Sequence, residues 1–145
     1  MDTMDRTSAV ESQQERTTKT TVAAMLNVRD GRRALAFYKA AFGAKEIFVI
    51  DNDAGVVAHL SIDGGEFWMA DAAPDYLNFS PDSLGGSTAR MVLTVDNPDL
   101  VFEQAIAAGA KAVQLVENQP YGWRLGRVMD PFGHHWEIGK PLTDH

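Results

Sequence analysis

The side chains best suited to chemistry lie near the C-terminus, in the run His134-His135-Trp136-Glu137. Side chains alternate along a strand, so His135 and Glu137 share one face while His134 and Trp136 share the other. An imidazole and a carboxylate on one face can supply half of a divalent metal site. His59 is the only other imidazole expected in the ordered chain. His59, His135 and Glu137 could form a metal site, but these three residues lack an assured further ligand. We therefore favour structural roles for them. His134 is expected to form a hydrogen bond within its own turn.

The composition excludes several classes of function. The chain of 145 residues contains no cysteine, which rules out disulfides, zinc-thiolate sites and a cysteine nucleophile. A net charge of -7 disfavours nucleic acid as a partner, because phosphate binding needs a basic surface. No segment approaches the roughly 20 apolar residues of a membrane span, and the start lacks the apolar run of a secretory signal. We therefore expect a cytoplasmic protein.

Two parts of the chain repeat one pattern. Asn27-Val28-Arg29-Asp30 leads into a helical run that closes at Gly43, and Thr94-Val95-Asp96-Asn97 leads into a run that closes at Gly109. Each run is followed by three extended segments, the last of which contains a tryptophan, Trp68 or Trp136. Such self-similarity predicts a duplicated strand–helix–strand–strand–strand unit, with a site where the two copies meet.

The expected fold class is α+β, with paired βαβββ units whose curved sheets surround a central cavity and whose helices lie outside. Residues 1–19 read as a disordered tail because they are polar and aperiodic. Residues 20–145 then form a single domain, with a first unit at 20–71, a linker at 72–87 and a second unit at 88–140. The predicted strands are 21–28, 46–51, 56–62, 66–70, 88–95, 112–117, 124–129 and 134–139.

These elements and their motifs resemble the vicinal oxygen chelate superfamily, which includes glyoxalase I, extradiol dioxygenases, and bleomycin- and fosfomycin-resistance proteins. The resemblance covers residues 22–142 and rests on three motifs. They are Val28-Arg29-Asp30, Phe37-Tyr38-x-x-x-Phe42-Gly43-Ala44, and the run GRVMDPFGHHWEIG from Gly126 to Gly139. The stretch Asp-Pro-Phe-Gly-His-x-Trp most resembles the PhnB-like branch. The resemblance implies a small-molecule ligand. Related proteins also commonly pair, sometimes exchanging units, and the exposed strand edges and apolar faces of such sheets favour a homodimer.

In metal-dependent members of that superfamily, equivalent strands of the two units supply four ligands. By resemblance these positions fall at Ala23, Met69, Arg90 and Glu137, of which only Glu137 carries an ordinary ligand. We therefore expect no metal cofactor, a divalent ion held by the histidine set above being the alternative. Two roles of Glu137 remain open. It forms an ion pair with Arg90, or it is unpaired and acts as a general base, the only catalytic role considered. Arg90, for its part, could hold an anionic ligand.

The sequence favours a metal-independent protein that binds a small planar or amphipathic organic molecule. Tyr121 and Trp123, which flank Gly122, offer aromatic surface for stacking. The expected ligand-binding residues are Asn27, Met69, Arg90, Tyr121, Trp123 and Glu137. The alternative is a divalent-metal-dependent lyase, isomerase or dioxygenase of the same superfamily, and a cavity filled by side chains would instead indicate an interaction module.

Overall fold

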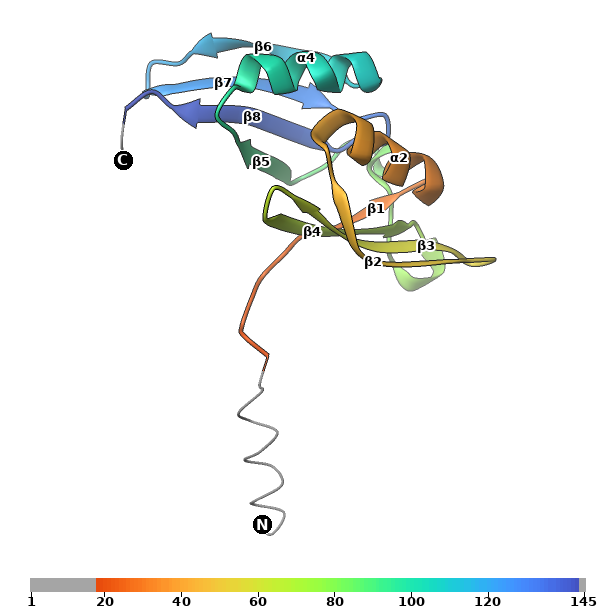
Figure 1. Cartoon of the computed structure of the whole chain (residues 1–145). Helices are drawn as coiled ribbons and strands as arrows, with labels where there is room; N and C mark the ends of the chain where they lie inside the picture. Colours follow the sequence, from red (N-terminus) through yellow and green to blue (C-terminus); the bar gives the residue numbers. More distant parts are fainter. Residues whose placement is uncertain (1–17, 144–145) are drawn as a thin grey trace, which may run out of the picture.

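The computed structural model describes residues 18–143 (Figure 1). Within these residues, the first half of the chain forms the first predicted unit. The predicted tail therefore lies almost entirely outside the described residues. The sheet has the order β1-β4-β3-β2, with β1 parallel to β4 and the other pairs antiparallel. Its elements are β1 (Met25–Val28), α2 (Gly31–Phe42), β2 (Lys45–Asn52), β3 (Gly55–Ile62) and β4 (Gly65–Asp71).

The second half repeats this arrangement in a sheet of order β5-β8-β7-β6. Here β5 runs parallel to β8, in the same way that β1 runs parallel to β4. The elements are β5 (Arg90–Thr94), α4 (Pro98–Ala108), β6 (Lys111–Asn118), β7 (Trp123–Met129) and β8 (His135–Pro141). The connection between the units carries two short helical turns, η1 (Pro74–Tyr76) and α3 (Pro81–Leu84). The predicted α+β class, built from two βαβββ units, is confirmed.

The long helices begin and end where the sequence places the caps. The Asp30 side chain accepts a hydrogen bond from the backbone N–H of Arg33 at 3.2 Å, and Gly43 ends the helix in the left-handed conformation with a φ of 68°. In the second unit Asn97 caps α4 by accepting from the N–H of Leu100 at 3.1 Å.

The first strand is shorter than predicted. It begins at Met25 rather than at residue 21, because β4 pairs with β1 only from Trp68 to Asp71. Before Met25, one further hydrogen bond joins the two segments, from the Trp68 N–H to the carbonyl of Ala24 at 2.8 Å. Ala23 therefore lies before the strand, in exposed chain.

One hydrophobic core joins the two units. Helix α2 packs on β3, β4 and α4, while α4 packs on β6, β7 and β8. The centroid of the Trp136 ring lies 4.6 Å from that of Phe42, 5.5 Å from that of Tyr38 and 5.4 Å from that of Phe67. Each sheet thus turns one face toward this core and its helix. The opposite face, here called the helix-free face, is not covered by α2 or α4. Aromatic side chains fill the part of this core that lies between α2, β4 and β8.

A buried carboxylate organises the centre of that core. Asp130, which is 1% exposed, accepts hydrogen bonds from the Tyr38 hydroxyl at 2.5 Å and the Trp136 indole at 3.0 Å. Its other oxygen accepts from the backbone N–H groups of Phe132 (2.9 Å) and His134 (3.0 Å). Burial, and then the adjacent Asp130 charge, raises the pKa of Tyr38 well above the ordinary value of 10.0. Asp130 thus links a helix of the first unit to the β7–β8 turn of the second.

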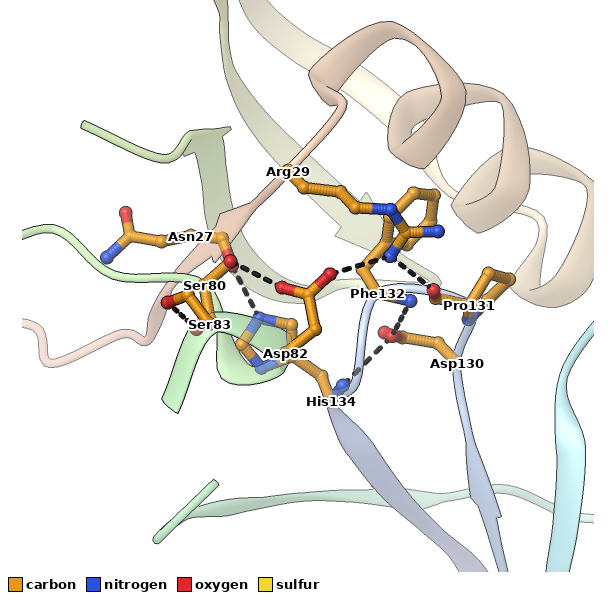
Figure 2. A network of polar contacts seen from close by, with 9 residues as sticks. All are labelled: Asn27, Arg29, Ser80, Asp82, Ser83, Asp130, Pro131, Phe132 and His134. Atoms are coloured by element: carbon orange, nitrogen blue, oxygen red, sulfur yellow. Dashed lines mark hydrogen bonds and ion pairs between the residues drawn. The ribbon is translucent and has the colours of Figure 1, made fainter. Parts of the chain in front are cut away.

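A second polar network fixes the linker between the units (Figure 2). The Arg29 guanidinium donates to the carbonyl of Pro131 at 2.7 Å and to Asp82 at 3.2 Å. His134 Nε2 lies 2.9 Å from the carbonyl oxygen of Asn27. The ring of His134 therefore ties its turn to β1 of the first unit, while its backbone N–H and carbonyl bond Asp130 of its own turn, as predicted. These contacts give the Asp-Pro-Phe-Gly-His stretch a structural role.

Candidate functional site

The chemically capable residues gather on the helix-free face of the second sheet. In β8 the buried residues Trp136 and Ile138 point into the core, so Glu137 between them points to the other side. The register places Arg127 of β7 and Val92 of β5 directly beside Glu137. These side chains consequently form one continuous surface across three strands.

Glu137 bridges two arginines. Arg90 Nε and Arg127 Nη2 each lie 2.8 Å from the same oxygen, Glu137 Oε2. The Glu137 side chain is only 14% exposed, whereas that of Arg90 is 56% exposed. The ion pair considered for Arg90 and Glu137 is thus present, and Arg127 supplies a second cation that the sequence analysis did not single out. The Arg127 contact is also a hydrogen bond, and hydrogen bonds between charged partners are the stronger kind, so it helps to hold the carboxylate in a fixed position.

A pocket of ≈ 200 Å³ opens beside this cluster. Its wall consists of Val92, Tyr121, Trp123, Leu125 and Glu137. The structure therefore brings together three of the predicted ligand-binding residues, Tyr121, Trp123 and Glu137, with Arg90 attached through its ion pair. The volume is comparable to that of an apolar cavity of about 150 Å³ that accommodates benzene.

Two predicted ligand-binding residues lie elsewhere. Asn27 lines a separate pocket of ≈ 660 Å³ where the two units and the linker meet, together with Met25 of β1, Met91 of β5, and Phe79 and Leu84 of the linker. Met69 is 0% exposed and packs in the core on the helix side of the first sheet. The expectation that Met69 lines the wall of a ligand cavity is therefore wrong.

The strand register explains this error. His59 pairs with Trp68 in the first sheet, and Arg127 pairs with Glu137 in the second. Trp68, rather than Met69, thus occupies the position equivalent to Glu137. Trp68 is half-buried on the helix-free face, and its ring stacks on that of His59 with centroids 4.1 Å apart and planes 6° from parallel. Trp68 therefore lies outside the core, whereas Trp136 is in the core at 2% exposure.

The residues at the inherited metal positions do not fit a divalent ion. With the corrected register these positions hold Ala23, Trp68, Arg90 and Glu137, and only the last offers a ligand oxygen. That carboxylate is already bonded to two guanidinium groups, whose positive charge opposes a cation.

The alternative metal set is not assembled either. His59 Nε2 lies 3.0 Å from Glu66 on the first sheet, whereas His135 and Glu137 lie on the second. Within residues 18–143 no group of three or more His, Asp or Glu side chains is placed to hold a metal ion.

The chain is similar to known proteins in sequence and in fold. Residues 20–138 match the family model described as the Glyoxalase/Bleomycin resistance protein/Dioxygenase superfamily. An uncharacterized protein of Mycobacterium tuberculosis (strain ATCC 25618 / H37Rv) is 38% identical over 124 residues, which cover 82% of this chain and 73% of the relative. The crystal structure of an Arabidopsis thaliana gene product is 28% identical with a TM-score of 0.68, covering 85% of this chain and 100% of that chain.

A more distant structure shares the fold alone. FosX, the fosfomycin resistance protein of Listeria monocytogenes, is 15% identical with a TM-score of 0.64, covering 88% of this chain and 93% of that chain. It was solved as a mutant complexed with Mn(II) and dihydroxypropylphosphonic acid. Among the helices described for the present chain, none is long and apolar enough to cross a membrane. From the family match, which spans most of its length, the chain belongs to the Glyoxalase/Bleomycin resistance protein/Dioxygenase superfamily.

Proposed function

We propose that this protein binds a small planar or amphipathic organic molecule on the helix-free face of its second sheet, without a metal ion at the family's metal position. The observation that carries this proposal is the pair of 2.8 Å contacts from Arg90 and Arg127 to Glu137 Oε2. They occupy the single carboxylate from which a metal site would have to be built. A cation placed there would have to compete with two guanidinium groups for the same oxygen.

The pocket wall supports ligand binding in a direct way. Small-molecule sites are mostly apolar with a few placed polar groups, and this pocket combines Val92 and Leu125 with Tyr121, Trp123 and one charged cluster. Aromatic rings offer a flat apolar surface, so a planar ligand gains both buried area and favourable ring geometry. Because Glu137 Oε2 is bonded to two arginines, we assign Glu137 to positioning these cations rather than to proton transfer.

The proposal includes a homodimer, in which a second copy of the chain covers the site. The helix-free faces carry large exposed apolar side chains, among them Met25 (49%), Phe48 (50%) and Val92 (65%). Such apolar surface is typical of an interface. In a homodimer the first-sheet face of one copy would cover the second-sheet face of the other, which would bring Asn27 near the bound molecule. Light scattering at micromolar concentration should give a dimer mass, and a monomer mass would contradict this part of the proposal.

The binding function is tested with the neutral planar probe N-phenyl-1-naphthylamine, whose fluorescence rises in an apolar site. We expect saturable binding that Trp123→Ala weakens about 10-fold, because a stacked ring and its buried area are lost. Arg33→Ala, on an exposed position of α2, is the matched control and should leave the affinity unchanged. Absence of binding, or an affinity indifferent to Trp123→Ala, would contradict the proposed site. Dependence of binding or turnover on an added divalent metal would instead favour the metal-dependent lyase, isomerase or dioxygenase.

A further inference from the structure

We propose that the molecule bound at this site is an organic anion, in its simplest form an aromatic carboxylate, held by Arg90 at its acidic end. This inference rests on the proposed function, because it names the chemical class of ligand for the same pocket. Three features support it: the charge balance of the cluster, its excess of hydrogen-bond donors, and its position beside an apolar wall.

The charge balance of the cluster is positive. Arg90 and Arg127 contribute two positive charges and Glu137 contributes one negative charge, which leaves a net charge of about +1. The chain as a whole carries -7, so the charge of this cluster is opposite in sign to that of the whole chain. The equivalent pair of the first sheet, His59 and Trp68, contains no arginine.

The cluster also has more donors than acceptors. A guanidinium group carries five N–H bonds in a planar fork and accepts none. The ion pair of Arg90 with Glu137 is made through Arg90 Nε, and more than half of the Arg90 side chain is exposed. The other N–H groups of Arg90 are therefore accessible to a ligand that brings acceptor oxygens, the partners that such donors normally find. A carboxylate brings two, and it matches the geometry of a guanidinium.

The position of the cluster defines how the ligand is oriented. Glu137 belongs to the pocket wall and at the same time holds Arg90, so the charged cluster and the apolar surface share a boundary. Arg90 is the more exposed of the two arginines, at 56% against 27% for Arg127. Arg90 is therefore the residue that can contact a ligand, while the less exposed Arg127 holds Glu137 in place from the neighbouring strand β7. An acidic group at Arg90 places an attached ring against Trp123 and Val92.

The test uses three probes that share one ring and differ in charge: benzoate, benzamide and benzylamine. Binding is measured by two-dimensional NMR of the tryptophan indole N–H signals at low ionic strength. We expect benzoate to bind about 10-fold more tightly than benzamide, which corresponds to one charge-assisted hydrogen bond at a partly exposed site. Benzylamine should bind more weakly than benzamide, and added salt should reduce the preference for benzoate.

Two substitutions at the cluster give opposite expectations. Arg90→Gln should lower the affinity for benzoate to that for benzamide, which itself should not change. Glu137→Gln preserves shape but raises the net charge of the cluster from about +1 to about +2, so benzoate should bind more tightly. Arg33→Gln, which removes a positive charge from the exposed surface of α2, is the control and should leave all three affinities unchanged.

The outcomes separate this inference from the proposed function. Equal affinities for the three probes, together with intact binding of N-phenyl-1-naphthylamine, would overturn the inference and leave the binding function standing. Unchanged benzoate affinity in Arg90→Gln, with unchanged far-UV circular dichroism, would also overturn it, because Arg90 would then not be the contact. Failure of all four molecules to bind would overturn both.

Discussion

Replacement of Tyr38 by Phe should destabilise the fold measurably without disturbing its packing. The change deletes one hydroxyl, which donates to Asp130 at 2.5 Å inside the core, and leaves the ring volume almost unchanged. A hydrogen bond to a charged group contributes about 1.5–3 kcal/mol. Asp130 keeps three other donors, from Trp136, Phe132 and His134, so the carboxylate is not left unpaired. We therefore expect a loss of about 2 kcal/mol, which lowers Tm by roughly 6 to 10 °C for a domain of this size.

Urea unfolding followed by circular dichroism measures this free energy, with Tyr76→Phe as the matched control. Tyr76 is 79% exposed, so its substitution should change the free energy of unfolding by less than about 0.5 kcal/mol. The pH dependence provides an independent check. The pKa of Tyr38 is raised in the folded state, so the stability it contributes is fully present below about pH 10 and is lost as the pH rises toward the folded-state pKa. The difference between wild type and Tyr38→Phe should consequently shrink above about pH 10. Equal stability of the two phenylalanine variants at pH 7 would refute the assigned role of Asp130.

Three further predictions concern packing and assembly. Gly31→Ala should lower the unfolding free energy by about 1–3 kcal/mol in the same urea assay, because a methyl group there meets the Asp71 carboxyl group, whereas Gly86→Ala, with open space around it, should be nearly neutral. Asp130→Ala should cost about 3–5 kcal/mol or prevent folding, because it removes the acceptor of four buried donors, and a cooperative unfolding transition close to that of wild type would contradict this. Phe48→Glu should shift the proposed dimer toward monomer in light scattering, because it places a charge on the helix-free face, and an unchanged mass would show that this face is not the interface.

The fold could be predicted from local signals because these agree with one another. Asp30 and Gly43 mark the ends of α2 through capping chemistry that depends only on neighbouring residues. The duplicated pattern then determines the second unit. The strand ends were less accurate, since the start of β1 is set by how far β4 extends beside it and not by its own residues.

The faces of the strands could not be read from the two tryptophans alone. Residues 60–67 connect His59 to Trp68, whereas residues 128–136, one residue more, connect the equivalent Arg127 to Glu137. Because side chains alternate with a period of two, this single residue moves one tryptophan to the helix-free face and the other into the core. Met69, which follows Trp68 as Glu137 follows Trp136, therefore lies on the opposite face of its sheet from the one that the resemblance implied.

The second arginine of the site had a signal that the sequence analysis did not use. Arg127 and Glu137 lie at equal distances along the chain from Phe132, in the centre of the Pro131–Gly133 turn. Residues placed symmetrically about a hairpin turn pair across it, so a search for opposite charges at such positions would have found this contact. The contact to Arg90 depends on the parallel pairing of β5 with β8, which brings together residues far apart in the sequence.

Elemental analysis of the purified protein, after incubation with Mn, Fe, Ni or Zn and extensive dialysis, tests the central claim most directly. The ion pair of Glu137 with Arg90 and Arg127 predicts far less than one metal ion per chain for all four, and no difference between wild type and Glu137→Ala. One metal ion per chain that is retained by wild type and lost in Glu137→Ala would place a metal at this position, and would contradict the account.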